Sequence, residues 1–183
     1  MHTFSVITAV LLAAVLHANA SPMPRQIGAF YFNGPDQSQV WVDLDPVPDG
    51  GGAPPVRVNV TIRFRGHELR DAPKTATIRV TSNRLAAPQK IRLPILTFRL
   101  ADDTVIDLTS GPAAVYTFVA SCDKCAADTL MADVPVSTLA HMRTSSVILV
   151  NAMGFDGRLV QEDVTAIGRL MDAVANGATV SDR

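Results

Sequence analysis

The residues best suited to chemistry are the two cysteines of the chain, Cys122 and Cys125, which are separated by only two residues. Thiols at this spacing can form a disulfide, exchange electrons with another thiol pair, or contribute to a metal site. Which of these applies depends on the compartment, because disulfides persist in oxidising compartments and are rare in the cytosol. The N-terminal segment indicates the compartment, and so it bears on the chemical state of the two cysteines.

Residues 1–20 have the features of a cleaved signal peptide. An apolar run from Val6 to Leu16 ends in the small-x-small pattern Ala18-Asn-Ala20, which predicts cleavage before Ser21. The run is shorter than the roughly 20 residues that a membrane-spanning helix needs. No later run approaches that length, so no transmembrane anchor is expected after cleavage. We therefore expect an exported protein, periplasmic or secreted.

Export favours a disulfide between Cys122 and Cys125. A loop this short gains only about 2 kcal/mol from closure, so the bond would mainly hold a local turn. The alternative is a thiol-disulfide redox protein with Cys122 as the attacking thiol and Cys125 as the resolving thiol. A strand that enters the cysteines, followed by a helix over residues 126–131, would be similar to the thioredoxin arrangement. Asp123, between the cysteines, disfavours a thiolate and speaks against that alternative.

The sequence offers little support for a metal site or for hydrolase chemistry. Outside the signal segment the histidines are His67 and His141, and neither is at ligand spacing from the cysteines. The segment from His67 begins like a zinc-protease motif but has Asp71 where a second histidine is required. No G-x-S-x-G nucleophile motif is present. We therefore expect no cofactor and no metal, and a non-enzymatic role in binding or in the cell envelope.

Arginines alternate with apolar residues along the predicted strands and could bind an anion. The candidates are Arg57, Arg63, Arg65 and Arg79, with Arg99 as a possible further member. Anionic glycans or lipid head groups could bind such a surface. The alternative is a solvated face on which two carboxylates of an earlier strand, Asp43 and Asp45, pair with Arg63 and Arg65. The net charge of −1 gives no global argument for binding nucleic acid.

Hydrophobic periodicity predicts a mainly β protein. Alternation with period two, bounded by turn residues, indicates strands at 28–32, 39–45, 56–65, 75–82, 91–100, 104–108, 115–120 and 146–152. A short helix is expected through Met142 with Ser137 as its N-cap, a tight turn at 154–157, and a longer helix at about 163–175. We predict one domain over residues 21–183, an antiparallel β-sandwich with a C-terminal helix. The alternative is an α+β fold.

From Cys122 onward the chain resembles the invasion-associated locus B family of exported bacterial proteins. The similar features are the close cysteines with Ala126, the helix around Leu139, an apolar strand, Asp156-Gly157 and the last helical segment. The resemblance implies a periplasmic or surface β-sandwich. It supplies no catalytic residues.

Overall fold

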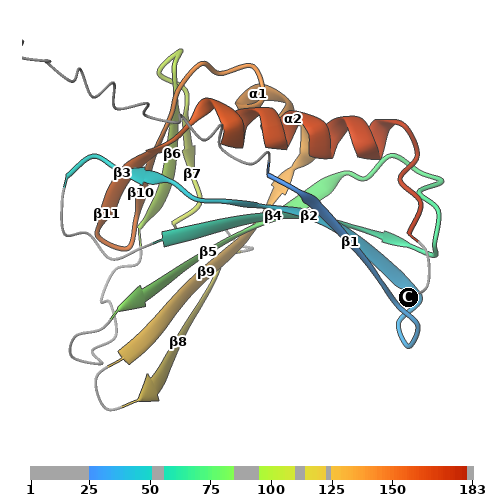
Figure 1. Ribbon diagram of the computed structural model, residues 1–183, viewed down its shortest axis with the longest axis horizontal. Helices are drawn as coiled ribbons and strands as arrows, with labels where there is room; N and C mark the ends of the chain where they lie inside the picture. The colour runs from blue at the N-terminus through green and yellow to red at the C-terminus, as the bar shows by residue number, and fades with distance from the viewer. Residues whose placement is uncertain (1–24, 51–55, 85–94, 110–113, 123–124, 181–183) are drawn as a thin grey trace, which may run out of the picture.

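A computed structural model of the chain describes residues 25–50, 56–84, 95–109, 114–122 and 125–180. Within these ranges the side chains of residues 83, 84, 118–122, 125 and 126 lie outside the description. The expected signal segment at residues 1–20 also lies outside it. The described residues form two antiparallel sheets and two helices (Figure 1).

The larger sheet has six strands in the order β1-β2-β4-β5-β9-β8, and every neighbouring pair is antiparallel. Its strands are β1 (Ile27–Phe32), β2 (Gln37–Leu44), β4 (Val56–Arg65), β5 (Thr75–Arg84), β8 (Val115–Cys122) and β9 (Cys125–Pro135). Strands that follow one another within this sheet are also neighbours in it, except that β9 inserts between β5 and β8. This topology leaves β1 and β8 as the two edges of the sheet.

The smaller sheet has five strands in the order β3-β11-β10-β6-β7. Its strands are β3 (Val47–Pro48), β6 (Leu96–Leu100), β7 (Val105–Asp107), β10 (Ile148–Ala152) and β11 (Phe155–Leu159). The predicted strand at residues 146–152 corresponds to β10, which is the central strand of this sheet. The buried side chains of both sheets belong to one hydrophobic cluster, so the architecture is the predicted antiparallel β-sandwich.

Strict alternation of side chains decides which face of each strand enters the core. On β4 the even-numbered apolar residues are buried and the arginines are exposed, as the sequence predicts. The same alternation buries Val40, Val42 and Leu44 on β2, and Ala76, Ile78 and Val80 on β5. The larger sheet therefore has an apolar inner face and a polar outer face.

Two helices pack against the sandwich. Helix α1 spans Val136–Met142 and contacts α2, which spans Gln161–Ala175 and lies along β2 (Figure 1). The predicted C-terminal helix is confirmed, and its apolar residues Val164, Ile167, Leu170 and Val174 are buried, with Met171 partly buried beside them. No helix among the described residues is both long enough and apolar enough to cross a membrane.

A buried carboxylate fixes the start of α2. Asp163 is fully buried and accepts a 3.2 Å hydrogen bond from the backbone N–H of Val160, which satisfies a donor just before the first turn. The guanidinium of Arg25 reaches the same carboxylate at 3.0 Å and Asp45 at 2.7 Å. Arg169 of α2 in turn donates to the carbonyl of Arg25. The segment that precedes β1 is thereby fastened to the helix.

Three local predictions were wrong. Residues 126–131 belong to strand β9 rather than to a helix, because Leu130, Ala132 and Val134 continue a period-two pattern that pairs with β5 over ten positions. Ser137 is not an N-cap, since α1 begins at Val136, whose N–H donates to the carbonyl of Lys74.

The tight turn between β10 and β11 also differs from the prediction. It consists of Met153 and Gly154, both with positive φ (51° and 82°), as in two-residue hairpins whose turn twist matches that of the strands. The turn therefore begins one residue earlier than expected, and Phe155 already belongs to β11.

We predict that Arg25→Met lowers the free energy of unfolding by about 1–3 kcal/mol at pH 7, because a buried carboxylate loses its cationic partner. Burial raises the pKa of Asp163 above its ordinary value of 3.8, although the Val160 N–H and Arg25 act in the opposite direction. A carboxyl group whose pKa is higher in the folded protein than in the unfolded chain stabilises the fold when it is protonated. This stabilisation is complete below the pKa of the unfolded chain and is lost as the pH rises through the pKa of the folded protein. The cost of Arg25→Met should therefore shrink in acid, where Asp163 is protonated.

Arg143→Met is the matched control for this measurement. Arg143 pairs with Asp172 at 3.0 Å, but both side chains are substantially exposed, so its loss should cost less than about 1 kcal/mol. Denaturant unfolding of both variants at several pH values measures the difference. Equal costs for the two variants would show that the buried carboxylate does not depend on Arg25.

Candidate functional site

The four arginine candidates lie together on the outer face of the larger sheet. Arg57, Arg63 and Arg65 alternate along β4, and Arg79 lies on the adjacent strand β5, opposite Asn59. All four side chains are exposed. We call this set, Arg57, Arg63, Arg65 and Arg79, the arginine face. Arg99 does not join it, because it lies on β6 in the smaller sheet.

The predicted neutralising pairs do not form. The register of β2 against β4 places Gln39 opposite Arg63 and Gln37 opposite Arg65. Asp43 lies opposite Asn59 instead and accepts a 2.9 Å hydrogen bond from its side-chain amide. Asp45 lies beyond the end of β2 and pairs with Arg25. The two carboxylates are therefore occupied elsewhere.

Three members of the arginine face form no ion pair with any other described residue, although the carboxylates of Asp43 and Asp133 lie on the same face. Within the described part of the chain, Arg57, Arg63 and Arg79 form no ion pair, and Arg79 makes a 3.3 Å contact from Nε to the sulfur of Met131. Arg65 pairs with Asp36 at 3.2 Å, but its side chain is 89% exposed, so this pair holds it weakly. The outer face therefore presents guanidinium groups directly to solvent.

Aromatic side chains border the arginine face at the edge strand β1. Phe30 and Phe32 are 47% and 38% exposed, and their rings meet edge to face with centroids 4.7 Å apart. Phe30 is opposite Gln39 and Phe32 opposite Gln37, so both lie on the outer face. Trp41, the single tryptophan, faces the same way one strand inward. We call Phe30, Phe32 and Trp41 the aromatic edge.

A glycine makes room for the tryptophan. A Cβ atom on Gly28 would lie 2.3 Å from two ring carbons of Trp41, so the indole rests directly on the backbone of β1. The spacing of Phe30 and Phe32 by two residues, with Tyr31 between them, is the sequence signal that could have revealed this edge. It was missed because a sequence does not show which strand lacks an outer neighbour.

The cysteines do not occupy the position that redox chemistry of the thioredoxin type requires. Cys122 ends β8, Cys125 begins β9, and the two are register partners across the hairpin. No helix follows them, so no helix N-terminus is available to lower a thiol pKa. Asp123, Lys124 and the side chains of both cysteines lie outside the described residues, and the disulfide stays a prediction.

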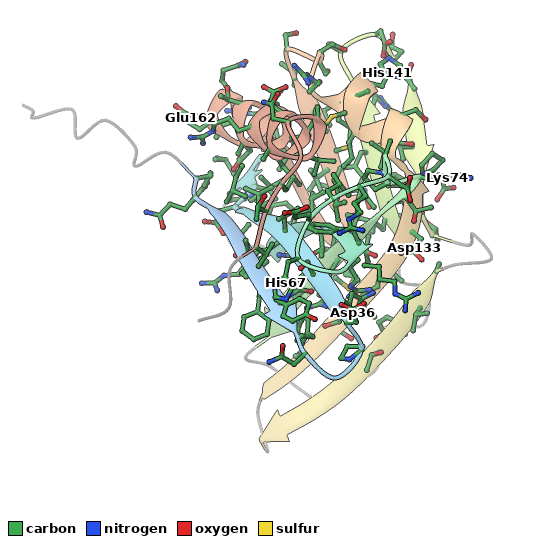
Figure 2. All side chains as sticks on the ribbon, turned by 90° about the vertical axis from the view of Figure 1, so that its right-hand side faces the viewer. Asp36, His67, Lys74, Asp133, His141 and Glu162 are labelled. Carbon is green, nitrogen blue, oxygen red and sulfur yellow. The ribbon has the colours of Figure 1, made fainter. Side chains whose placement is uncertain are left out.

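A cleft of about 700 Å³ lies beside the β1–β2 hairpin. It is lined by Asp36 and by the segment that follows β4, residues 64–73. Figure 2 shows Asp36 and His67 close to one another there, with His141 at the opposite end of the molecule. The Tyr31 hydroxyl donates to Asp36 at 2.9 Å, and this bond, together with Arg65, holds the pKa of Asp36 below its ordinary value. The carboxylate is thus kept ionised by its neighbours.

His67 connects this cleft to the C-terminal segment. Its ring stacks on Tyr31 with centroids 3.6 Å apart, and its Nδ1 donates to the carbonyl of Val180 at 3.0 Å. The backbone of Val180 donates in return to the carbonyl of His67, and Leu69 donates to Ala178. His67 therefore holds two chain segments together. In the described ranges, no three His, Cys, Asp or Glu side chains come close enough to hold a metal ion.

Comparisons with protein-family models, curated proteins and solved structures find no significant match to this chain. The resemblance to the invasion-associated locus B family therefore stays a prediction that rests on the residues after Cys122.

We predict that Gly28→Ala forces the indole of Trp41 away from β1 and costs about 1–3 kcal/mol of unfolding free energy, as overpacking does elsewhere. Because Trp41 is the only tryptophan, its fluorescence emission should shift to longer wavelength as the ring gains water. Gly34→Ala in the same hairpin is the control, since a Cβ there meets nothing within 4 Å. An unchanged spectrum in Gly28→Ala would contradict the packing described above.

Proposed function

We propose that this chain is an exported, non-enzymatic binding protein and that its arginine face binds a polyanion. The observation that carries the proposal is the absence, among the described residues, of any ion pair to Arg57, Arg63 or Arg79. Guanidinium groups bind sulfate, phosphate and carboxylate through paired hydrogen bonds. Asn59 and Thr77 lie between the arginines on the same face and donate hydrogen bonds to the carboxylates of Asp43 and Asp133, which holds these two negative groups on protein donors.

The spacing of the arginines favours an extended ligand over a single small anion. Arg57 and Arg63 lie six residues apart on one strand, which separates their Cα atoms by about 20 Å. One phosphate or carboxylate cannot contact both. A chain or array of anionic groups can, so the ligand is expected to be a polymer or a charged surface. Because the net charge is only −1, attraction depends on this local arrangement.

Export and a periplasmic or secreted location are part of the same proposal. They rest on the signal-like sequence of residues 1–20, with the polyanion as a component of the cell envelope or of its surroundings. The resemblance to the invasion-associated locus B family supports the same location.

Binding to immobilised heparin, a soluble model polyanion, tests the proposal. We predict that the protein is retained at low salt and that the triple variant Arg57→Gln, Arg63→Gln, Arg79→Gln elutes at markedly lower salt. The control is Arg99→Gln, Arg143→Gln, Arg158→Gln, which changes the net charge equally but leaves the arginine face intact. If both triple variants shift alike, retention reflects overall charge and the proposed site is wrong.

For the cysteines we propose a structural disulfide. Register partners on antiparallel strands have Cα atoms roughly 4.5–5.5 Å apart, which lies within the range that a disulfide spans. We predict a reduction potential below about −300 mV in a glutathione titration, as for structural disulfides. Cys122→Ala should lose no more than about 2 kcal/mol of stability and keep its heparin retention. A more oxidising potential with a reactive Cys122 thiol would favour the redox alternative.

A further inference from the structure

We propose that the surface bound by this protein is a lipid bilayer that carries anionic head groups, and that the aromatic edge inserts into it beside the arginine face. The inference rests on the proposed polyanion function and names its ligand. It begins from two side chains that the fold leaves exposed without a structural reason, Phe30 and Phe32.

Edge strands of soluble proteins are normally protected by charged residues, prolines or bulges, because exposed apolar edges promote association. Strand β1 instead presents Phe30 and Phe32, with 47% and 38% of their surface exposed, on an edge with no further strand beside it in the described sheet. Neither ring is needed to fill the core, since both lie on the outer face. Two adjacent exposed aromatic rings on a polar face are typical of a contact surface.

The register joins these rings to the arginines. Phe30, Gln39 and Arg63 form one cross-strand row, and Phe32, Gln37 and Arg65 form the next. Neighbouring strands lie roughly 4.8 Å apart, so each phenylalanine is about 10 Å from an arginine on the same face. Arginine side chains can extend over the intervening glutamine. Apolar rings at the edge and cationic groups two strands inward thus share one continuous surface.

Such a combination matches the chemistry of a membrane–water interface better than that of a polysaccharide. Aromatic rings enter the boundary between head groups and acyl chains, while basic side chains remain in water and pair with anionic lipids. Tryptophan is enriched at that depth, and Trp41 lies on the same face, next to the two phenylalanines. A polysaccharide would use the arginines but gives no role to two phenyl rings packed edge to face.

Flotation with lipid vesicles tests the inference on the full chain. We expect binding to phosphatidylcholine vesicles that contain phosphatidylglycerol, weak binding to pure phosphatidylcholine, and loss of binding at high salt. Phe30→Ser with Phe32→Ser should weaken vesicle binding by about tenfold or more and leave heparin retention unchanged. Arg63→Gln should weaken both.

A matched control removes exposed apolar area from the opposite side of the molecule. Val105 and Leu149 are 53% and 40% exposed on the outer face of the smaller sheet, so Val105→Ser with Leu149→Ser should bind vesicles normally. Trp41 gives a readout that needs no substitution, because lipids with brominated acyl chains should quench its fluorescence if the aromatic edge enters the bilayer.

The outcomes separate this inference from the proposed function. Heparin retention without binding to phosphatidylglycerol vesicles overturns the membrane inference and leaves a soluble polyanion as the ligand. If the protein neither is retained on heparin nor binds the vesicles, both the membrane inference and the proposed polyanion function are wrong. Vesicle binding unaffected by the serine pair at 30 and 32, or affected equally by the control pair, overturns insertion of the aromatic edge. A dimer in sedimentation analysis that the serine pair dissolves shows that a second copy covers β1, and this also overturns the inference.

Discussion

Strand β4 pairs with β2 over Val58–Arg65 and with β5 over Val56–Thr61, and both ladders are antiparallel. Its side chains alternate strictly, so the pairing that buries Val58, Val60 and Ile62 is also what turns Arg57 and Arg63 outward. A slip of one residue would place arginines in the core and valines in water, which the buried face cannot tolerate. The core and the candidate binding surface are therefore two consequences of one register, and neither can change without the other.

The alternation of β4 is also why the sequence predicts it residue for residue. Its unbroken period over Val56–Arg65 leaves no competing interpretation. Strand β9 gave a weaker signal, because Ala126 and Ala127 near its start favour a helix by propensity, and pairing with β5 outweighs that preference. The partners of the arginines were beyond prediction for a different reason. Which residues lie opposite the arginines depends on the register of β2 against β4. That register is set by the length and path of the connection between the two strands, and local propensity does not determine it.

The aromatic edge could not be predicted from the sequence alone. Phe30 and Phe32 look like ordinary strand residues, and a strand of this kind in the middle of a sheet would have them covered. Only the sheet order, with β1 outermost, makes them a surface. Likewise, the burial of Asp163 and its contact with Arg25 join residues that are 138 positions apart, and no local pattern connects them. Local sequence patterns predict most of the strands and the C-terminal helix, whereas the exposed surface depends on which strands are neighbours in the sheet.

The hydrogen bonds between residues 67–69 and 178–180 have a bearing on the order in which parts of the protein open. Val180 is buried, and it exchanges hydrogen bonds with His67, while Leu69 donates to Ala178. A segment held by a few hydrogen bonds opens at a lower free energy than the strands of a packed sheet. Opening of residues 178–180 would break these bonds without breaking any pairing between the strands of the larger sheet. The cleft lined by residues 64–73 can therefore change shape while the sandwich stays folded.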